Sequence, residues 1–120
     1  MAGCSATTTV DPDMQGGRDV FPTCAACHGS DGTGGSAPSL AGVLDTFPDC
    51  ETQVRWIRLG SERWKAEVGP TYGANDAPVD RVMPSFEALG DLALRRVAFY
   101  ERVRFGDADP DTERAACGLG

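Results

Sequence analysis

The sequence predicts an all-α fold of roughly three to five helices. Apolar residues recur at helical spacing over residues 90–104, and Gly106 follows where that helix would end. Two further stretches, 14–24 and 51–59, also have helical character, and no strand-like run precedes Cys24. Glycine-rich and turn-rich stretches separate these segments, so we expect helices joined by loops.

Length and charge limit the classes of protein to consider. A chain of 120 residues forms one domain with a modest core. Its net charge of −7 argues against nucleic acid and anionic membrane surfaces as partners and favours docking faces that are basic or apolar. No apolar run is long enough to cross a membrane.

Residues 1–13 are expected to form a flexible tether. Ala2-Gly3-Cys4-Ser5 resembles the end of a bacterial lipoprotein signal, and the Ser/Thr-rich stretch after it resembles a spacer. Two interpretations stay open: Cys4 is lipidated and anchors the protein to a membrane, or the segment is an ordinary terminus with a free thiol.

The first expected helix, residues 14–24, contains a proline and two adjacent glycines, Gly16 and Gly17. Each glycine costs about 1 kcal/mol relative to alanine inside a helix. Their presence makes sense if a second helix crosses here at close backbone distance. Val20 or Phe21, one turn later, would pack beside the crossing, so either Gly16 with Val20 or Gly17 with Phe21 fits.

The next stretch, Cys24-Ala25-Ala26-Cys27-His28, has the spacing of a c-type haem attachment site. The two thiols would add to the haem vinyl groups, so they must lie about one helical turn apart. The histidine directly after the second thiol is then placed under the iron as its proximal ligand.

Two other interpretations of this motif are weaker. A thioredoxin-like redox pair would need a strand–helix context, which is missing before Cys24. A zinc site would need a second close Cys/His pair, but His28 is the only histidine, and Cys50 and Cys117 stand alone.

The glycine-rich stretch 29–43 is expected to be a loop around the haem edge, with Pro38 and Leu40 as its fixed points. A backbone carbonyl near Pro38 would accept the Nδ1–H of His28 and fix the orientation of the ring. The helix at 51–59 should end at Gly60.

Beyond Gly60, residues 61–82 are polar and rich in turns. In the helix at 90–104, the charged residues, Glu101 and Arg102 among them, are expected mainly on the outer side. The acidic tail 107–120 should be disordered unless Cys117 pins it.

In this order the features resemble a bacterial class I, mono-haem cytochrome c, with the resemblance covering residues 14–106. It rests on the CAACH motif, the glycine-rich loop with its proline and leucine, the Met-Pro pair, and a last helix with a late aromatic residue. The resemblance implies helices wrapped around one covalently attached haem, with the N- and C-terminal helices crossing. It also implies thioethers at Cys24 and Cys27, and axial ligation by His28 and Met83.

The resemblance implies further contacts. Tyr100 and Val97 would lie against the glycine of the first helix. The segment 61–82 departs from the family pattern, because it is longer than in the smallest members. We expect it to cover the distal side or a propionate edge of the haem, with two aromatic residues either donating hydrogen bonds there or simply packing in the core. The residues expected to line the haem beyond its attachments and ligands are Pro38, Leu40, Trp64 and Tyr72.

The implied function is one-electron transfer rather than enzymatic turnover, in an extracytoplasmic chain in the periplasm or on the outer face of the cytoplasmic membrane. Partners would be a quinol-oxidising complex upstream and an oxidase or reductase downstream. Two alternatives stay open: a haem module held permanently in a larger oxidoreductase complex, and a peroxidase or gas-binding protein with Met83 displaced.

The remaining cysteines lead to one more prediction. With Cys24 and Cys27 occupied by haem and Cys4 lipidated, Cys50 and Cys117 remain to form a disulfide in an oxidising compartment. Pairing with Cys4 and an intermolecular bridge are the alternatives.

Overall fold

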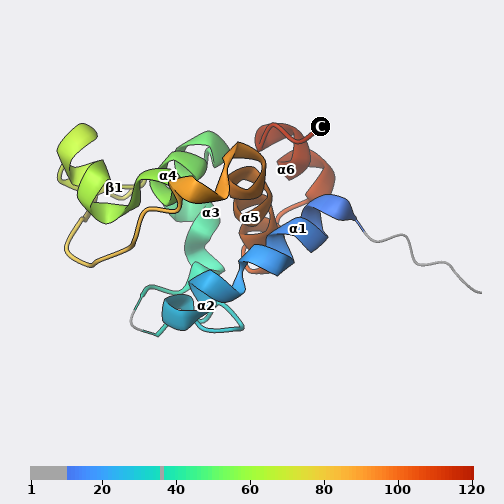
Figure 1. The fold of residues 1–120 in the computed structure, drawn as a ribbon, viewed down its shortest axis with the longest axis horizontal. Helices are drawn as coiled ribbons and strands as arrows, with labels where there is room; N and C mark the ends of the chain where they lie inside the picture. The colour runs from blue at the N-terminus through green and yellow to red at the C-terminus, as the bar shows by residue number, and fades with distance from the viewer. Residues whose placement is uncertain (1–10, 36) are drawn as a thin grey trace, which may run out of the picture.

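The computed structural model describes residues 11–35 and 37–120, so Cys4 and most of the expected tether lie outside the described residues. The α-helices in chain order are α1 (Pro12–Val20), α2 (Pro22–His28), α3 (Val43–Thr46), α4 (Cys50–Glu67), α5 (Asp91–Arg104) and α6 (Pro110–Ala116) (Figure 1). Short 3₁₀ turns, η2 (Leu40–Gly42) and η3 (Glu87–Leu89), precede α3 and α5. The prediction of an all-α fold is confirmed. Among the described residues, no helix is long and apolar enough to span a membrane.

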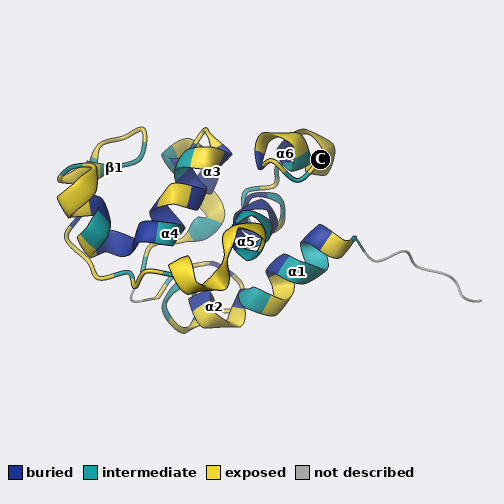
Figure 2. Ribbon diagram, turned by 45° about the horizontal axis from the view of Figure 1, so that its top comes forward, coloured by how far each residue is buried: buried dark blue, intermediate teal, exposed yellow. Residues whose placement is uncertain are grey.

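Helix α1 crosses α5 at close range (Figures 1 and 2). Asp11 begins α1 by accepting the amide of Asp13 (2.9 Å), and the helix ends at Val20. A β-carbon on Gly17 would lie 2.3 Å from Cβ of Tyr100 and 2.5 Å from the Arg96 carbonyl oxygen. Gly17 is therefore the contact glycine of the crossing.

Phe21 completes this crossing and settles which of the two alignments applies. Its ring centroid lies 5.6 Å from that of Tyr100 and 5.0 Å from that of Phe105, and the side chain is buried. The structure thus pairs Gly17 with Phe21 rather than Gly16 with Val20.

The helix predicted over 51–59 ends at Gly60, as expected, because Gly60 leaves helical geometry with φ 74° and ψ 174°. A second helical segment begins directly after this kink and runs to Glu67, and α4 comprises both segments. The segment beyond it, expected to be rich in turns, completes α4 and then forms two short antiparallel strands, β1 (Thr71–Tyr72) and β2 (Ala77–Pro78). Val54 and Ile57 are buried on the inner face of α4.

Two charged residues predicted on the outer side of α5 are buried instead. Glu101 is 4 % exposed and Arg102 is 2 % exposed. Helix α5 packs against α1, α4 and α6, so little of its circumference faces solvent. Arg102 donates to the backbone carbonyls of Phe47 and Pro48, and its Nε pairs with Glu113 of α6.

The acidic tail is ordered. Asp109 caps α6 by accepting the amide of Thr112 (2.9 Å). The predicted disulfide between Cys50 and Cys117 is present, with 5.2 Å between the Cα atoms and both side chains buried. It links the end of α6 to the start of α4. The tail was expected to be ordered only if Cys117 held it in place, and the disulfide does so.

Candidate haem-binding site

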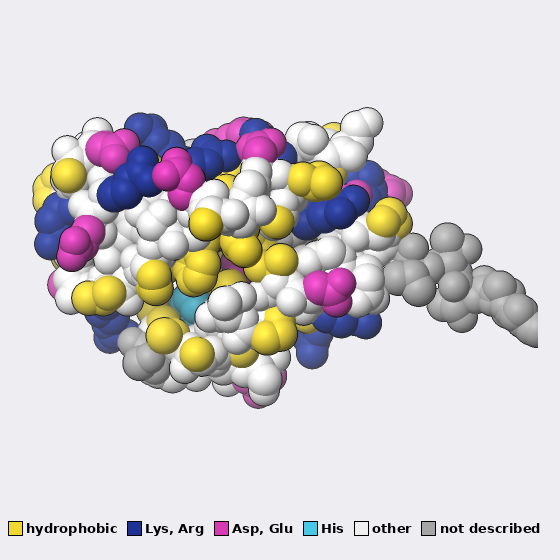
Figure 3. Space-filling model, viewed as in Figure 1, with side chains coloured by type: hydrophobic (Ala, Val, Ile, Leu, Met, Phe, Trp, Pro, Cys, Tyr) yellow, Lys and Arg dark blue, Asp and Glu magenta, His cyan; other side chains and the backbone are white. Residues whose placement is uncertain are grey.

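A cavity of about 360 Å³ lies between α2, the loop that follows it, α4, α5 and the segment from β2 to η3. Most of the side chains around it are apolar. In the space-filling view, a ring of hydrophobic side chains surrounds an opening in which the single histidine is visible (Figure 3). The cavity therefore offers an apolar chamber with an imidazole at its entrance.

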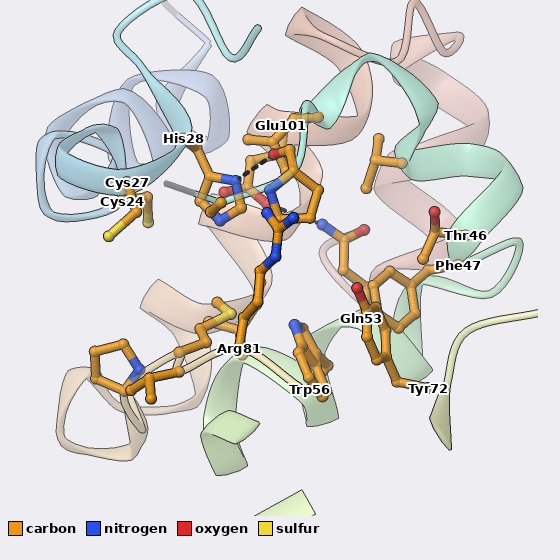
Figure 4. Close-up of a pocket in the computed structure, with 18 of the residues that line it drawn as sticks. Cys24, Cys27, His28, Thr46, Phe47, Gln53, Trp56, Tyr72, Arg81 and Glu101 are labelled. Carbon is orange, nitrogen blue, oxygen red and sulfur yellow. Dashed lines mark hydrogen bonds between the residues drawn. The ribbon is translucent and has the colours of Figure 1, made fainter. Parts of the chain in front are cut away.

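The CAACH motif forms the last five residues of α2 and places Cys24, Cys27 and His28 in the wall of this cavity (Figure 4). The Nδ1–H of His28 donates to the carbonyl oxygen of Pro38 at 2.8 Å, as the sequence predicted. This bond fixes the tautomer and the ring orientation, and it leaves Nε2 for another partner.

The glycine-rich loop reaches His28 by packing directly on the motif. The amide of Ala37 donates to the Cys27 carbonyl at 3.1 Å, and a β-carbon on Gly35 would lie 2.8 Å from that same oxygen. A side chain at position 35 would push the loop away, and the Pro38 carbonyl would move with it. The loop composition is thus required for the histidine geometry.

The two motif cysteines are not bonded to each other. Burial raises the pKa of the Cys24 thiol to about 12, and the nearby carboxylate of Glu101 adds to this effect. A thioredoxin-like cysteine has a lowered pKa, so the structure does not support that interpretation. Nor do the described residues contain a group of three or more His, Cys, Asp or Glu side chains arranged to hold a metal ion, which leaves the zinc interpretation without support.

Met83 lines the cavity from the segment between β2 and η3. Leu40, predicted as a fixed point of the loop, lines it as well. Tyr72 also belongs to the wall, stacked on Trp56 with 4.3 Å between ring centroids. The sequence-predicted residues Pro38, Leu40, Tyr72 and Met83 are therefore brought together around the motif.

Trp64 is the predicted residue that the structure does not bring to the cavity. It packs edge-on against Trp56, with 5.3 Å between ring centroids, and it is buried. Its indole N–H already donates to the carbonyl oxygen of Thr71 at 2.9 Å. Trp64 is a core residue behind the cavity wall, and its donor is used by the backbone.

The sequence analysis missed the polar part of the wall. Glu101 and Gln53 both line the cavity, and Gln53 Nε2 donates to Glu101 Oε1 at 3.0 Å. Burial raises the pKa of Glu101 to about 8. Helical spacing could have found both, because Gln53 lies one turn before Ile57 and Glu101 one turn after Val97. Arg81 also lines the cavity, and its side chain extends into it (Figure 4).

The residues present fit a haem. The walls are mainly apolar, as a flat hydrophobic macrocycle requires. One imidazole nitrogen is left for iron by the Pro38 hydrogen bond, and a thioether sulfur borders the same space. Two unpaired thiols stand one helical turn apart at its edge. These features define a small all-α protein of the kind that binds haem covalently.

The comparison with protein families agrees. A family model described as cytochrome c matches residues 14–100, and the chain belongs to the cytochrome c family. Its fold is that of an all-α class I cytochrome c. Membership implies covalently bound haem c, electron transfer with redox partner proteins, and the extracytoplasmic location typical of such domains. Searches of curated proteins and of solved structures found no match.

Proposed function

We propose that this protein carries single electrons in an extracytoplasmic electron-transport chain, with one haem attached through Cys24 and Cys27 and with His28 and Met83 as the iron's axial ligands. The observation that carries this proposal is the hydrogen bond from His28 to Pro38 beside a cavity that Met83 also lines. When bound, the haem supplies an iron that gains and loses one electron reversibly.

The protein's own residues supply position and environment. The Pro38 carbonyl keeps the His28 ring in one orientation, which favours a fixed ligand in both oxidation states. A thioether as second ligand raises the reduction potential and leaves no open coordination position, which suits electron transfer and opposes substrate turnover. The mainly apolar walls would lower the local dielectric constant around the haem.

Partners and anchoring belong to the same proposal. The carrier would accept electrons from a quinol-oxidising complex and pass them to an oxidase or reductase, with Cys4 as a candidate lipid anchor. A haem module held permanently in a larger complex is the alternative that leaves the site chemistry unchanged. A peroxidase or gas-binding protein would instead need Met83 away from the iron.

The variant Met83→Ala tests the ligand assignment. We expect the haem to remain covalently attached, the reduction potential to fall, and carbon monoxide to bind the reduced protein, because the sixth position is opened. Met14→Ala, which changes a methionine of α1, serves as the matched control and should keep the potential and exclude carbon monoxide. An unchanged potential together with excluded carbon monoxide in Met83→Ala would show that another group holds the iron.

A further inference from the structure

Helix α4 is broken where the Met83 segment lies against it. Gly60 has a φ of 74°, and a β-carbon there would lie 2.6 Å from the Ser85 amide nitrogen and 2.7 Å from the Met83 carbonyl oxygen. Both neighbours are backbone atoms, which cannot yield as a flexible side chain would. Glycine at this position therefore allows two things at once: the left-handed turn and the close approach of the Met83 segment.

Ser61, the residue after the break, holds both backbone polar groups of Met83. Its amide donates to the Met83 carbonyl oxygen at 2.8 Å, and its Oγ accepts the Met83 amide at 2.9 Å. Ser61 is 3 % exposed, so its side of these bonds is shielded from water. Ser61 does not line the cavity, and it acts on the site only through Met83.

The break also releases helix carbonyls, and the same segment uses them. In an unbroken helix the Ser61 amide would bond to the carbonyl of Ile57. Here the Phe86 amide donates to the Ile57 carbonyl oxygen at 3.1 Å, and Ser85 Oγ donates to the carbonyl oxygen of Arg58 at 2.7 Å. Hydrogen bonds that would have continued α4 are thus exchanged for bonds to residues 83–86.

We infer that the break of α4 at Gly60–Ser61 exists to position the distal ligand, and that Ser61 is a positioning residue for the sulfur of Met83. The inference rests on the proposed function, because it assigns this role toward a methionine-ligated iron. A thioether is a neutral ligand at the end of a flexible side chain. The fraction of protein with sulfur away from iron therefore depends on how firmly the Met83 backbone is held.

Imidazole binding to the oxidised, haem-loaded protein measures that fraction, because imidazole must displace the sulfur to reach the iron. In Ser61→Ala, the part-buried Met83 amide loses its acceptor in the ligated state. We expect imidazole to bind about tenfold more tightly than to the wild type. The red absorption band of methionine-ligated oxidised haem should weaken in parallel. Ser85→Ala, which removes the second anchor of the segment, should tighten imidazole binding about threefold, and it carries the test if Ser61→Ala does not fold.

Thr52→Ala is the matched control for lost stability. Its hydroxyl donates to the capping carboxylate of Asp49 at the far end of the same helix (2.8 Å), so its loss destabilises α4 without touching the Met83 segment. Its imidazole affinity should equal that of the wild type. An unchanged affinity in Ser61→Ala, or an equal increase in Thr52→Ala, would overturn the positioning role.

Met83→Ala separates this inference from the proposed function. If wild type and Met83→Ala bind imidazole equally tightly, Met83 is not the ligand and the proposed function itself fails. If Met83→Ala binds far more tightly than the wild type while Ser61→Ala does not, the ligand assignment stands and only the role of Ser61 is lost.

Discussion

The buried carboxyl of Glu101 should make the stability of this protein fall as pH rises through neutrality. Burial raises its pKa from 4.5 to about 8, against the smaller opposing effect of the hydrogen bond from Gln53. Below pH 4.5 the group is protonated in both the folded and the unfolded protein. Between 4.5 and about 8 only the unfolded chain has released the proton, so the unfolded state binds fewer protons and stability decreases with pH.

The size of the effect follows from this interval. Each tenfold change in proton affinity is worth about 1.4 kcal/mol, so the free energy of unfolding should lose about 5 kcal/mol from this one group between pH 4.5 and about 8 and then level off. That loss is comparable with the whole stability of many small domains. The protein tolerates the carboxyl at neutral pH because the folded state keeps it protonated.

Glu101→Gln removes the titration and keeps the shape and an acceptor for Gln53. We expect its free energy of unfolding, measured by urea titration of the haem-loaded protein, to match the wild type near pH 4.5 and to exceed it increasingly up to about pH 8. Glu62→Gln, a change at an exposed position of α4, should keep the wild-type pH dependence. Parallel stability curves for Glu101→Gln and wild type across this range would refute the assignment of a raised pKa.

Two further predictions concern the frame of the fold. Gly17→Ala should destabilise the folded protein by about 1–3 kcal/mol or more, because the new β-carbon would meet Tyr100 and the backbone of α5, whereas at Gly16 it would meet only a movable arginine side chain and the effect should be nearly neutral. Thermal melts of the two variants test this, and equal small effects would contradict the crossing. Replacing both Cys50 and Cys117 by serine opens a loop of sequence separation 67 and should lower the free energy of unfolding, measured by urea titration, by about 4 kcal/mol. An unchanged midpoint would mean that α6 is held without the disulfide.

Local chemistry explains what the sequence could predict. The CAACH motif predicts the haem attachment site by itself, because two thiols and an imidazole on about one helical turn have few other uses. The Pro38 carbonyl was predictable because a ligating histidine needs a partner at Nδ1 and the loop offers few fixed points. The pairing of Cys50 with Cys117 followed from counting the thiols that remained.

The prediction failed where a residue's neighbours come from distant parts of the chain. The helical pattern of α5 assumes one buried face and one exposed face. Arg102 is buried because α6 and the end of α3 cover the side that would otherwise face solvent, and α6 is held there by a disulfide to α4. The second helical segment, from Ser61 to Glu67, was missed for the same reason, since the Met83 backbone that packs on the break lies far along the chain.

Arg102, which does not line the cavity, determines how the polar residues Gln53 and Glu101 of its wall are oriented. Gln53 Oε1 accepts from Arg102 Nη1 at 3.1 Å, so its Nε2 must point the other way, where it donates to Glu101 at 3.0 Å. Arg102 is in turn held by Glu113 and by backbone carbonyls. The amide of Gln53 therefore cannot turn to offer its oxygen to a protonated Glu101, and the carboxyl faces a donor whether it is ionised or not. Helix α6 thus takes part in the environment of the haem cavity through Glu113 and Arg102, although neither of these two residues lines the cavity.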